Sequence, residues 1–359
     1  MKLKARKAEH SRVCTFPLRR FFNISFPSRF NRLSTSSTAK MASLKTDGSA
    51  GPNISLPEPV SRTGPSSSSI MSKLPDGYVV HHFSRFKLLR TCAKVLVESL
   101  QSKSENQWLV ILGLTQSAIR KLDEDHSCLE GIEYRFAWEG HAGFIKIVPS
   151  FEHDSVTDGV TRVLDLSLIK MGLESTISRK WVGTTMYKPT ANKGKQADQG
   201  FLPPSRRPSA PGLPPGWPTL TIETGLSKSL SQLRQDALWW LSNSSGEVRI
   251  VLVISISKRE DRVFIEVWQL APPNSPRPLT RAYIQTLCQQ SPNIPPLVQQ
   301  QAVSQQAYCA HEVEISANGV TGAPLTLPFV AVYDRPPAQG EGDIVLTGQN
   351  FLDVTSDLF

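Results

Sequence analysis

A chain of 359 residues with a formal net charge of +9 is long enough for two average domains, or for one domain with unfolded flanks. Only 39% of the residues are hydrophobic and 27 are prolines, which predicts that part of the chain is unfolded. No apolar run approaches the roughly eighteen residues that a membrane-spanning helix needs. The composition therefore excludes a membrane-spanning protein, and we expect a soluble one.

The positive charge is concentrated at the N-terminus. Residues 1–40 contain ten lysines and arginines against one acid, Glu9, and the remaining 319 residues contain 30 basic and 30 acidic groups. A nucleic-acid surface on the folded part would therefore be a local patch, since that part as a whole is not basic. Five scattered cysteines with no Cys-x-x-Cys pair predict free thiols in a reducing, intracellular compartment.

Residues 1–75 are expected to be a disordered extension. Its first forty residues are rich in Arg and Ser and contain few acids, which fits a mitochondrial presequence, but an unstructured basic tail of a nuclear or cytoplasmic protein fits as well. Residues 34–75 read as a Ser/Thr/Pro/Gly linker. We expect a single domain over residues 76–359, with a core at 156–270 and a C-terminal part at 271–359 made of a Gln/Pro-rich connector and short strands.

The first ordered elements follow in chain order. Apolar residues recur every three or four positions from Phe83 to Leu100, which predicts an amphipathic helix of about twenty residues. Residues 108–114 form an apolar run that fits a strand or a buried helix. Two apolar runs on either side of a Gly/His turn predict a hairpin of residues 134–138 and 144–148. A second helix is expected over 156–169, ending before Gly172.

The central region predicts a mixed α/β fold. Three strands are expected at residues 181–187, 197–201 and 219–223, with a polar turn at 188–196 and an exposed proline-rich loop at 203–218. A helix follows at residues 230–241, with Ser229 and Gln232 at capping-box spacing. Two β-branched runs, at 248–256 and 263–270, predict buried strands. Further on, residues 279–307 fit a helix or a loose connector, and short strands are expected at 313–315, 325–330 and 343–346.

Asp198 and Glu223 are the candidate metal ligands. Each closes a predicted strand, and because the two strands are consecutive, pairing between them would bring both carboxylates to one edge of the sheet. Two carboxylates at such an edge are suitable ligands for Mg²⁺ or Mn²⁺. A bound metal would polarise a phosphate and activate a water molecule, so the pair predicts phosphodiester chemistry on DNA or RNA.

The order helix, strand, strand ending in Asp, strand ending in Glu, helix, strand resembles the core of the PD-(D/E)XK, or restriction-endonuclease-like, superfamily. The segments 218–229, 235–241, 246–250 and 265–268 are similar to a family of uncharacterised fungal proteins, as are Arg335-Pro-Pro and Glu341-Gly-Asp-Ile344 near the C-terminus. The resemblance covers residues 76–359. It implies an α-β-β-β-α-β core and a metal-dependent nuclease, with Asp198 and Glu223 as catalytic metal ligands.

Two positions depart from the superfamily pattern. Ala197 stands where the proline before the Asp is expected, and Gly225 stands where the catalytic lysine is expected, two residues after the Glu. Within the superfamily this lysine can instead lie on a neighbouring element. Lys228 is therefore the candidate catalytic lysine, and Arg234 is a second candidate for the same role. A glycine at this position is equally what a catalytically inactive descendant would carry.

Other sites are weaker candidates. Residues 225–229 imitate the nucleophile elbow of a serine hydrolase, but the second glycine is Ser229. The segment 193–195 lacks the upstream glycine of a phosphate-binding loop. His141 and His153 could line a site, and Trp239 and Trp240 could stack on bases, although one of the two must be core. Two hypotheses remain: an active metal-dependent nuclease, or an inactive nuclease-fold protein that binds nucleic acid or a protein.

Overall fold

The computed structural model describes residues 78–101, 106–148, 151–210, 212–226, 229–289 and 304–358. These residues belong to one compact unit that begins at Arg62. The extension expected over residues 1–75, with its presequence and linker, lies outside the described residues. Nowhere in the described ranges is a helix both long and apolar enough to cross a membrane.

The first of two six-stranded sheets comes from the N-terminal half of the described chain. Its strand order is β1-β2-β4-β3-β6-β5, with bounds β1 Val79–His82, β2 Trp108–Leu112, β3 Tyr134–Glu139, β4 Ala142–Ile147, β5 Met186–Thr190 and β6 Lys193–Gln196. The expected hairpin is confirmed, because β3 and β4 pair antiparallel. Helices α1 (Phe86–Gln101) and α2 (Gln116–Glu124) and the 3₁₀ turn η1 (His126–Leu129) share one apolar core with this sheet.

The second sheet contains the region with the clearest sequence pattern. Its order is β12-β11-β10-β9-β8-β7, with bounds β7 Gln199–Phe201, β8 Leu220–Leu226, β9 Ile250–Ser257, β10 Arg262–Leu270, β11 Ala307–Ser316 and β12 Gly319–Thr321. Strands β8 and β9 are parallel and are joined through α4 (Leu230–Asn243), and the other neighbours are antiparallel. The strands and helix expected between residues 219 and 270 are confirmed.

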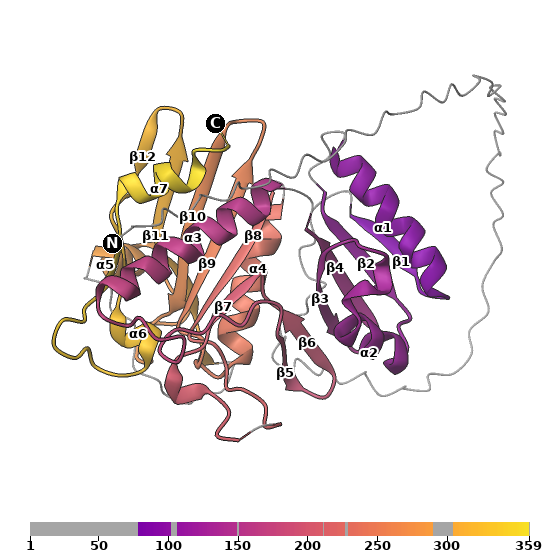
Figure 1. The fold of residues 1–359 in the computed structure, drawn as a ribbon, viewed down its shortest axis with the longest axis horizontal. Helices are drawn as coiled ribbons and strands as arrows, with labels where there is room; N and C mark the ends of the chain where they lie inside the picture. The colour runs from indigo at the N-terminus through magenta and orange to yellow at the C-terminus, as the bar shows by residue number, and fades with distance from the viewer. Residues whose placement is uncertain are drawn as a thin grey trace, which may run out of the picture. The chain divides into compact units, whose positions relative to one another are not determined.

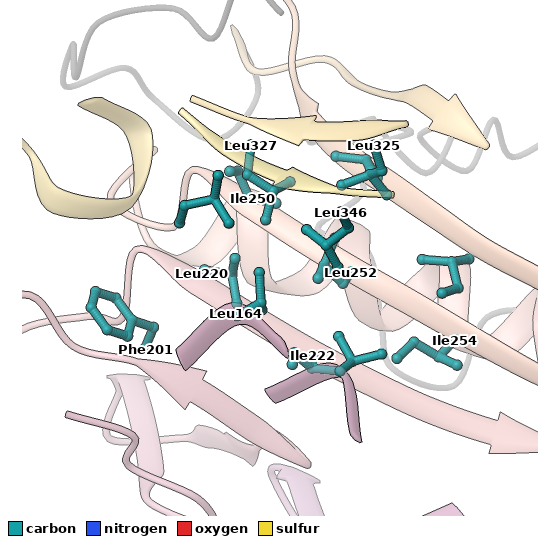
Figure 2. Close-up of a cluster of buried hydrophobic side chains, with 14 of the residues drawn as sticks. Leu164, Phe201, Leu220, Ile222, Ile250, Leu252, Ile254, Leu325, Leu327 and Leu346 are labelled. Carbon is teal, nitrogen blue, oxygen red and sulfur yellow. The ribbon is translucent and has the colours of Figure 1, made fainter. Parts of the chain in front are cut away.

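Alternate residues of β9 pack against opposite layers, as side chains of a strand must. Ile250, Leu252 and Ile254 lie in the core that also contains Leu164 of α3 (Phe151–Lys170), as Figure 2 shows. Val251 and Val253 pack with residues of α4. Helices α3 and α4 therefore cover opposite faces of the second sheet (Figure 1). Both faces are buried, which explains the continuous β-branched run that predicted this strand.

The C-terminal elements complete the core on the α3 side. They are a two-stranded sheet of β13 (Leu325–Leu327) and β14 (Ile344–Leu346), α6 (Phe329–Tyr333) and α7 (Gly348–Thr355). Helix α5 (Arg281–Gln289) packs on β11 in a separate small apolar cluster that contains Leu287 and Tyr308. The strand expected over residues 325–330 is therefore too long, because Phe329 begins a helix. Arg335 donates to both carboxylate oxygens of Glu341 at 2.6 Å, so the two C-terminal segments singled out in the sequence bind one another.

The region between α3 and β8 differs from the sequence prediction. Residues 181–187 are not a strand: Trp181 makes one isolated bridge to Phe201, and β5 begins only at Met186. The polar turn expected at 188–196 is instead the β5–β6 hairpin. Among the described residues of the loop at 203–218, the one helical element is the 3₁₀ turn η2 (Pro204–Arg206). The hairpin was missed because a polar segment was taken to be exposed, whereas Lys195 and Gln196 of β6 are buried.

A buried ionic cluster as candidate functional site

Asp198 and Glu223 do come together, although neither closes a strand. Asp198 lies in the short link between β6 and β7, and Glu223 lies in the middle of β8, which continues to Leu226 because its last residues pair with β9. Gln199 is opposite Ile222 in the antiparallel register of β7 and β8. If this register is continued by one residue, back from Gln199 and forward from Ile222, Asp198 lies opposite Glu223. Antiparallel pairing, and not two strand ends, places the carboxylates side by side.

Lys146 joins the two carboxylates. Its Nζ donates to Asp198 Oδ2 at 2.5 Å, to Glu223 Oε2 at 2.9 Å and to the backbone oxygen of Thr224 at 3.2 Å. The lysine comes from β4 of the first sheet, where Phe144 on the same face is buried against α4. A lysine on this inward face can reach β8 of the second sheet only across the interior. One ammonium group thus contacts three oxygen atoms of the second sheet and its edge.

A second lysine occupies the other side of Glu223. Lys195 Nζ of β6 lies 3.2 Å from Glu223 Oε1 and 3.0 Å from Asp236 Oδ1 of α4. The indole of Trp240, one helical turn after Asp236, donates to Glu223 Oε1 at 2.7 Å. Both oxygens of Glu223 are therefore paired with donors. Trp239 and Trp240 are buried, which leaves neither of them available for stacking on bases as they stand.

Two further basic side chains face Asp198. Arg135 Nε of β3 lies 3.2 Å from Asp198 Oδ1, and His153 Nε2 of α3 lies 3.6 Å from Asp198 Oδ2. His153 Nε2 is also 3.1 Å from the Thr224 backbone oxygen, and the backbone N–H of Thr224 donates to Asp198 Oδ2 at 2.8 Å. His153 is thus part of the cluster, whereas His141 contacts the backbone oxygen of Leu114.

Burial and mutual attraction set the protonation of the cluster. Burial raises the pKa of Asp198, but Lys146, His153 and Arg135 outweigh it and hold that pKa well below its ordinary value. Burial lowers the pKa of Lys146, and the attraction of Asp198 and Glu223 more than reverses this. Burial also lowers the pKa values of His153 and Lys195, but nearby carboxylates raise them above their ordinary values. These carboxylates are Asp198 for His153, and Asp236 and Glu223 for Lys195. Three carboxylates therefore face two ammonium groups, one guanidinium and a readily protonated imidazole.

Asp236 is the carboxylate that holds a proton most readily. Burial raises its pKa from the ordinary 3.8 to about 6, with Lys195 opposing the rise and Glu223 adding to it. Between these two values the folded protein binds a proton that the unfolded chain lacks, so stability decreases as pH rises through this window. Relative to Asp236→Asn, the wild-type free energy of unfolding is expected to increase as pH falls from 7 to 4.5. Urea titrations of both proteins measure this difference, and a constant difference would contradict the assignment.

The cluster does not fit a resident divalent metal. The oxygens of Asp198 and Glu223 that would bind one already contact Lys146, and those on their other sides face Arg135 and Lys195. Adding a dication to a group of charges that is already balanced would bring it against two ammonium groups. Within the described ranges, no group of three or more His, Cys, Asp or Glu side chains is placed to hold a metal ion. The predicted magnesium site is therefore not supported by the arrangement of these side chains.

The position of the expected catalytic lysine has a steric explanation. A Cβ atom on Gly225 would lie 2.7 Å from Ser229 Oγ and 3.2 Å from Leu233 Cδ1, so a side chain there would require these side chains of the following segment to move. Lys228 lies outside the described residues. Arg234 donates to Glu266 of β10 and so is engaged away from Asp198 and Glu223. The capping box was wrong, because Ser229 Oγ donates to the Leu226 backbone oxygen instead of capping α4.

Replacing Gly225 by Ala is expected to lower the free energy of unfolding by about 1–3 kcal/mol, as overpacking of a close interface does. Gly342→Ala is the matched control, since a Cβ there meets no atom within 4 Å. Denaturant unfolding of the two variants measures the difference. Equal stabilities would show that the approach of β8 to α4 is not tight.

The sequence contained a signal for the residues that were missed. Lys146 is a single charge within the apolar run of β4, and Arg135 lies beside the buried Tyr134 and Phe136 in β3. Asp236 lies beside the apolar stripe of α4 that includes Leu233 and Ala237. A charge on an inward face must find a partner inside the protein. Reading these positions as paired interior charges would have indicated the cluster, though not which charge meets which.

The fold and the cluster define a mixed α/β protein with mixed sheets and a buried ionic centre. No family model matches the chain, and no curated protein matches it. Among solved structures, a crystal structure of a "putative nuclease belonging to DUF820 from Anabaena variabilis" aligns with a TM-score of 0.34 and 12% identity, over 62% of this chain and 91% of that one. The functional conclusion therefore depends on the side chains of this chain itself.

Four of the five cysteines lie in the described ranges, and all four are free thiols: Cys92, Cys128, Cys288 and Cys309. This agrees with the absence of Cys-x-x-Cys spacing in the sequence.

Proposed function

We propose that this protein is a catalytically inactive nuclease-like domain that acts by binding a basic segment of another protein. The nuclease-like part of the proposal is supported by the order α3, β7, β8, α4, β9 and by the facing acids Asp198 and Glu223. The inactive part is supported by one observation: these acids are closed inside an ionic cluster.

The ionic cluster differs from a hydrolytic site because its acids are buried away from solvent. The exposed fractions of Lys146, Asp198 and Glu223 are 1%, 4% and 0%. A phosphodiester would have to reach carboxylates that no solvent reaches, and it would have to displace a lysine from both of them. Buried ion pairs of this kind need every charge for mutual neutralisation. The acids therefore contribute to the structure and not to hydrolysis.

A groove between α3 and α7 offers an accessible surface for a partner. It contains a hollow of about 640 Å³, with Phe151 68% exposed and Leu166 49% exposed on its apolar side. The charged residues that line this hollow are one arginine, Arg162, and four aspartates: Asp154, Asp158, Asp353 and Asp357. Acidic walls repel the phosphates of nucleic acid and attract lysine and arginine. Apolar residues between acidic walls fit a basic amphipathic peptide.

The catalytic part of the proposal is tested with the full-length chain. Plasmid and single-stranded DNA and RNA are incubated with Mg²⁺ or Mn²⁺ and with wild type, Asp198→Ala or Glu223→Ala. We expect no cleavage above buffer from any of them. Wild-type cleavage that disappears in both variants would overturn the proposal. It would establish the second candidate function, a metal-dependent nuclease, which is favoured by the convergence of Asp198 and Glu223 on one cation.

The binding part is tested with a fluorescent amphipathic peptide of lysine and leucine, followed by anisotropy at increasing salt. The double variant Asp353→Asn/Asp357→Asn is expected to weaken binding about tenfold, which corresponds to ~1.4 kcal/mol. Leu166→Ala should weaken it as well. Ile177→Ala is the control, because Ile177 is 71% exposed but does not line the groove. Binding that is insensitive to the groove variants, or preferred binding of nucleic acid, would overturn the assignment.

A further inference from the structure

The surroundings of the Lys146 ammonium resemble those of a metal ion. Its three oxygen contacts come from two carboxylates, Asp198 and Glu223, and from the backbone carbonyl of Thr224. Carboxylates and carbonyls are the oxygen ligands that Mg²⁺, Mn²⁺ and Ca²⁺ take in proteins. The contacts of 2.5–3.2 Å are those of a hydrogen-bonding ammonium, longer than the roughly 2.1 Å of a Mg²⁺–oxygen bond.

Neighbouring hydrogen-bond donors hold the Asp198 and Glu223 carboxylates in place around Lys146. The backbone N–H of Thr224 donates to the same oxygen of Asp198 that Lys146 contacts, and Trp240 holds the opposite oxygen of Glu223. Lys146 itself packs with its Nζ 5.9 Å from the centre of the Trp108 ring. The ammonium therefore contacts Trp108 of the neighbouring strand β2 in its own sheet and is surrounded by oxygens from the other sheet and its edge.

We infer that Lys146 is a built-in cation that occupies the position between Asp198 and Glu223 where a divalent metal would otherwise bind. Together with Arg135 and Lys195, the lysine neutralises the two acids, so folding needs no metal and the site accepts none. It also ties β4 of the first sheet to β8 of the second, residues 77 positions apart in the chain. The inference rests on the proposed absence of catalysis but fails separately from it.

The first measurement uses the wild-type full-length chain and Mn²⁺ as the probe. Electron paramagnetic resonance of free Mn²⁺ is followed as protein is added. We expect no site that depends on Asp198, so wild type and Asp198→Asn should deplete free Mn²⁺ equally. Stoichiometric Mn²⁺ binding to wild type that is lost in Asp198→Asn would overturn the inference, whatever any variant of Lys146 does.

The second measurement removes the built-in cation. Lys146→Ala leaves the three oxygens without their ammonium, and Mn²⁺ should then bind and stabilise the variant. We expect 1 mM Mn²⁺ to raise the Tm of Lys146→Ala by about 4 °C or more, and to leave wild type and the surface control Lys188→Ala unchanged. Adding Asp198→Asn to Lys146→Ala should abolish the rise. A folded Lys146→Ala variant that gains no Mn²⁺ binding would contradict the inference.

The two proposals have distinguishable failures. Mn²⁺ binding at Asp198 and Glu223 of wild type without cleavage would overturn the built-in cation and leave the inactive domain standing. Cleavage that needs Glu223 but shows no metal bound at Asp198 would overturn the inactive domain and leave the built-in cation standing.

Discussion

Lys146→Met is expected to lower the free energy of unfolding by about 3–5 kcal/mol, the range for breaking a buried ion pair from one side. Methionine keeps most of the length and the apolar contacts of the lysine. The loss therefore reports the charge, whose removal leaves Asp198 and Glu223 facing one another in the interior without their shared partner. Urea unfolding followed by tryptophan fluorescence measures the change.

Lys188→Met is the matched control for this prediction. Lys188 Nζ lies 2.7 Å from Asp123, but its side chain is 50% exposed. An exposed ion pair contributes about 0–1 kcal/mol, because water and salt screen the charges. If Lys146→Met were as stable as Lys188→Met, the cluster would not carry the energetic role assigned to it here.

Glu223→Gln is expected to destabilise the metal-free protein by about 3 kcal/mol or more. The amide retains the size of the side chain and an acceptor for Trp240, but it removes the negative charge that both Lys146 and Lys195 contact. The sign of this change distinguishes the two functional hypotheses. In a metal site with two unneutralised acids, removing one would relieve repulsion and stabilise the protein without metal.

Glu260→Gln is the control for Glu223→Gln. Glu260 pairs with Arg262 at 3.0 Å in the exposed β9–β10 turn, with 52% of its side chain exposed. Its replacement should change the free energy of unfolding by at most about 1 kcal/mol. Denaturant titrations in the presence of a chelator compare the two variants. A Glu223→Gln protein more stable than wild type would favour the metal-dependent nuclease.

The two acids illustrate how a site can be predicted for a partly mistaken reason. Asp198 and Glu223 were paired in the sequence because each was taken to end a strand, whereas the structure pairs them through the antiparallel register of β7 and β8. The sequence singled them out as acids at the ends of consecutive predicted strands and through the resemblance to the nuclease superfamily. Their state could not be found, since it depends on a lysine from another sheet.

The sequence by itself determined strands β8, β9 and β10 of the second sheet and helices α3 and α4. The β-branched runs of β9 and β10 and the apolar stripe of α4 are local patterns, set by which side chains fit a buried strand or one face of a helix. The β5–β6 hairpin was not predicted because its sequence is polar and was taken for a turn. Lys195 of that hairpin is buried only by its partners Glu223 and Asp236, which lie on other elements.

Only the tertiary structure decided which groups the two acids contact. The single charge of Lys146 in the apolar sequence of β4 indicates a paired interior charge, but nothing local indicates that its partners are Asp198 and Glu223, respectively 52 and 77 positions later. The same two carboxylates would serve a metal if solvent and a dication reached them, and they stabilise the fold when an ammonium group lies between them. Which of these holds depends on long-range packing of charges, and packing of that kind leaves no periodic trace along the chain.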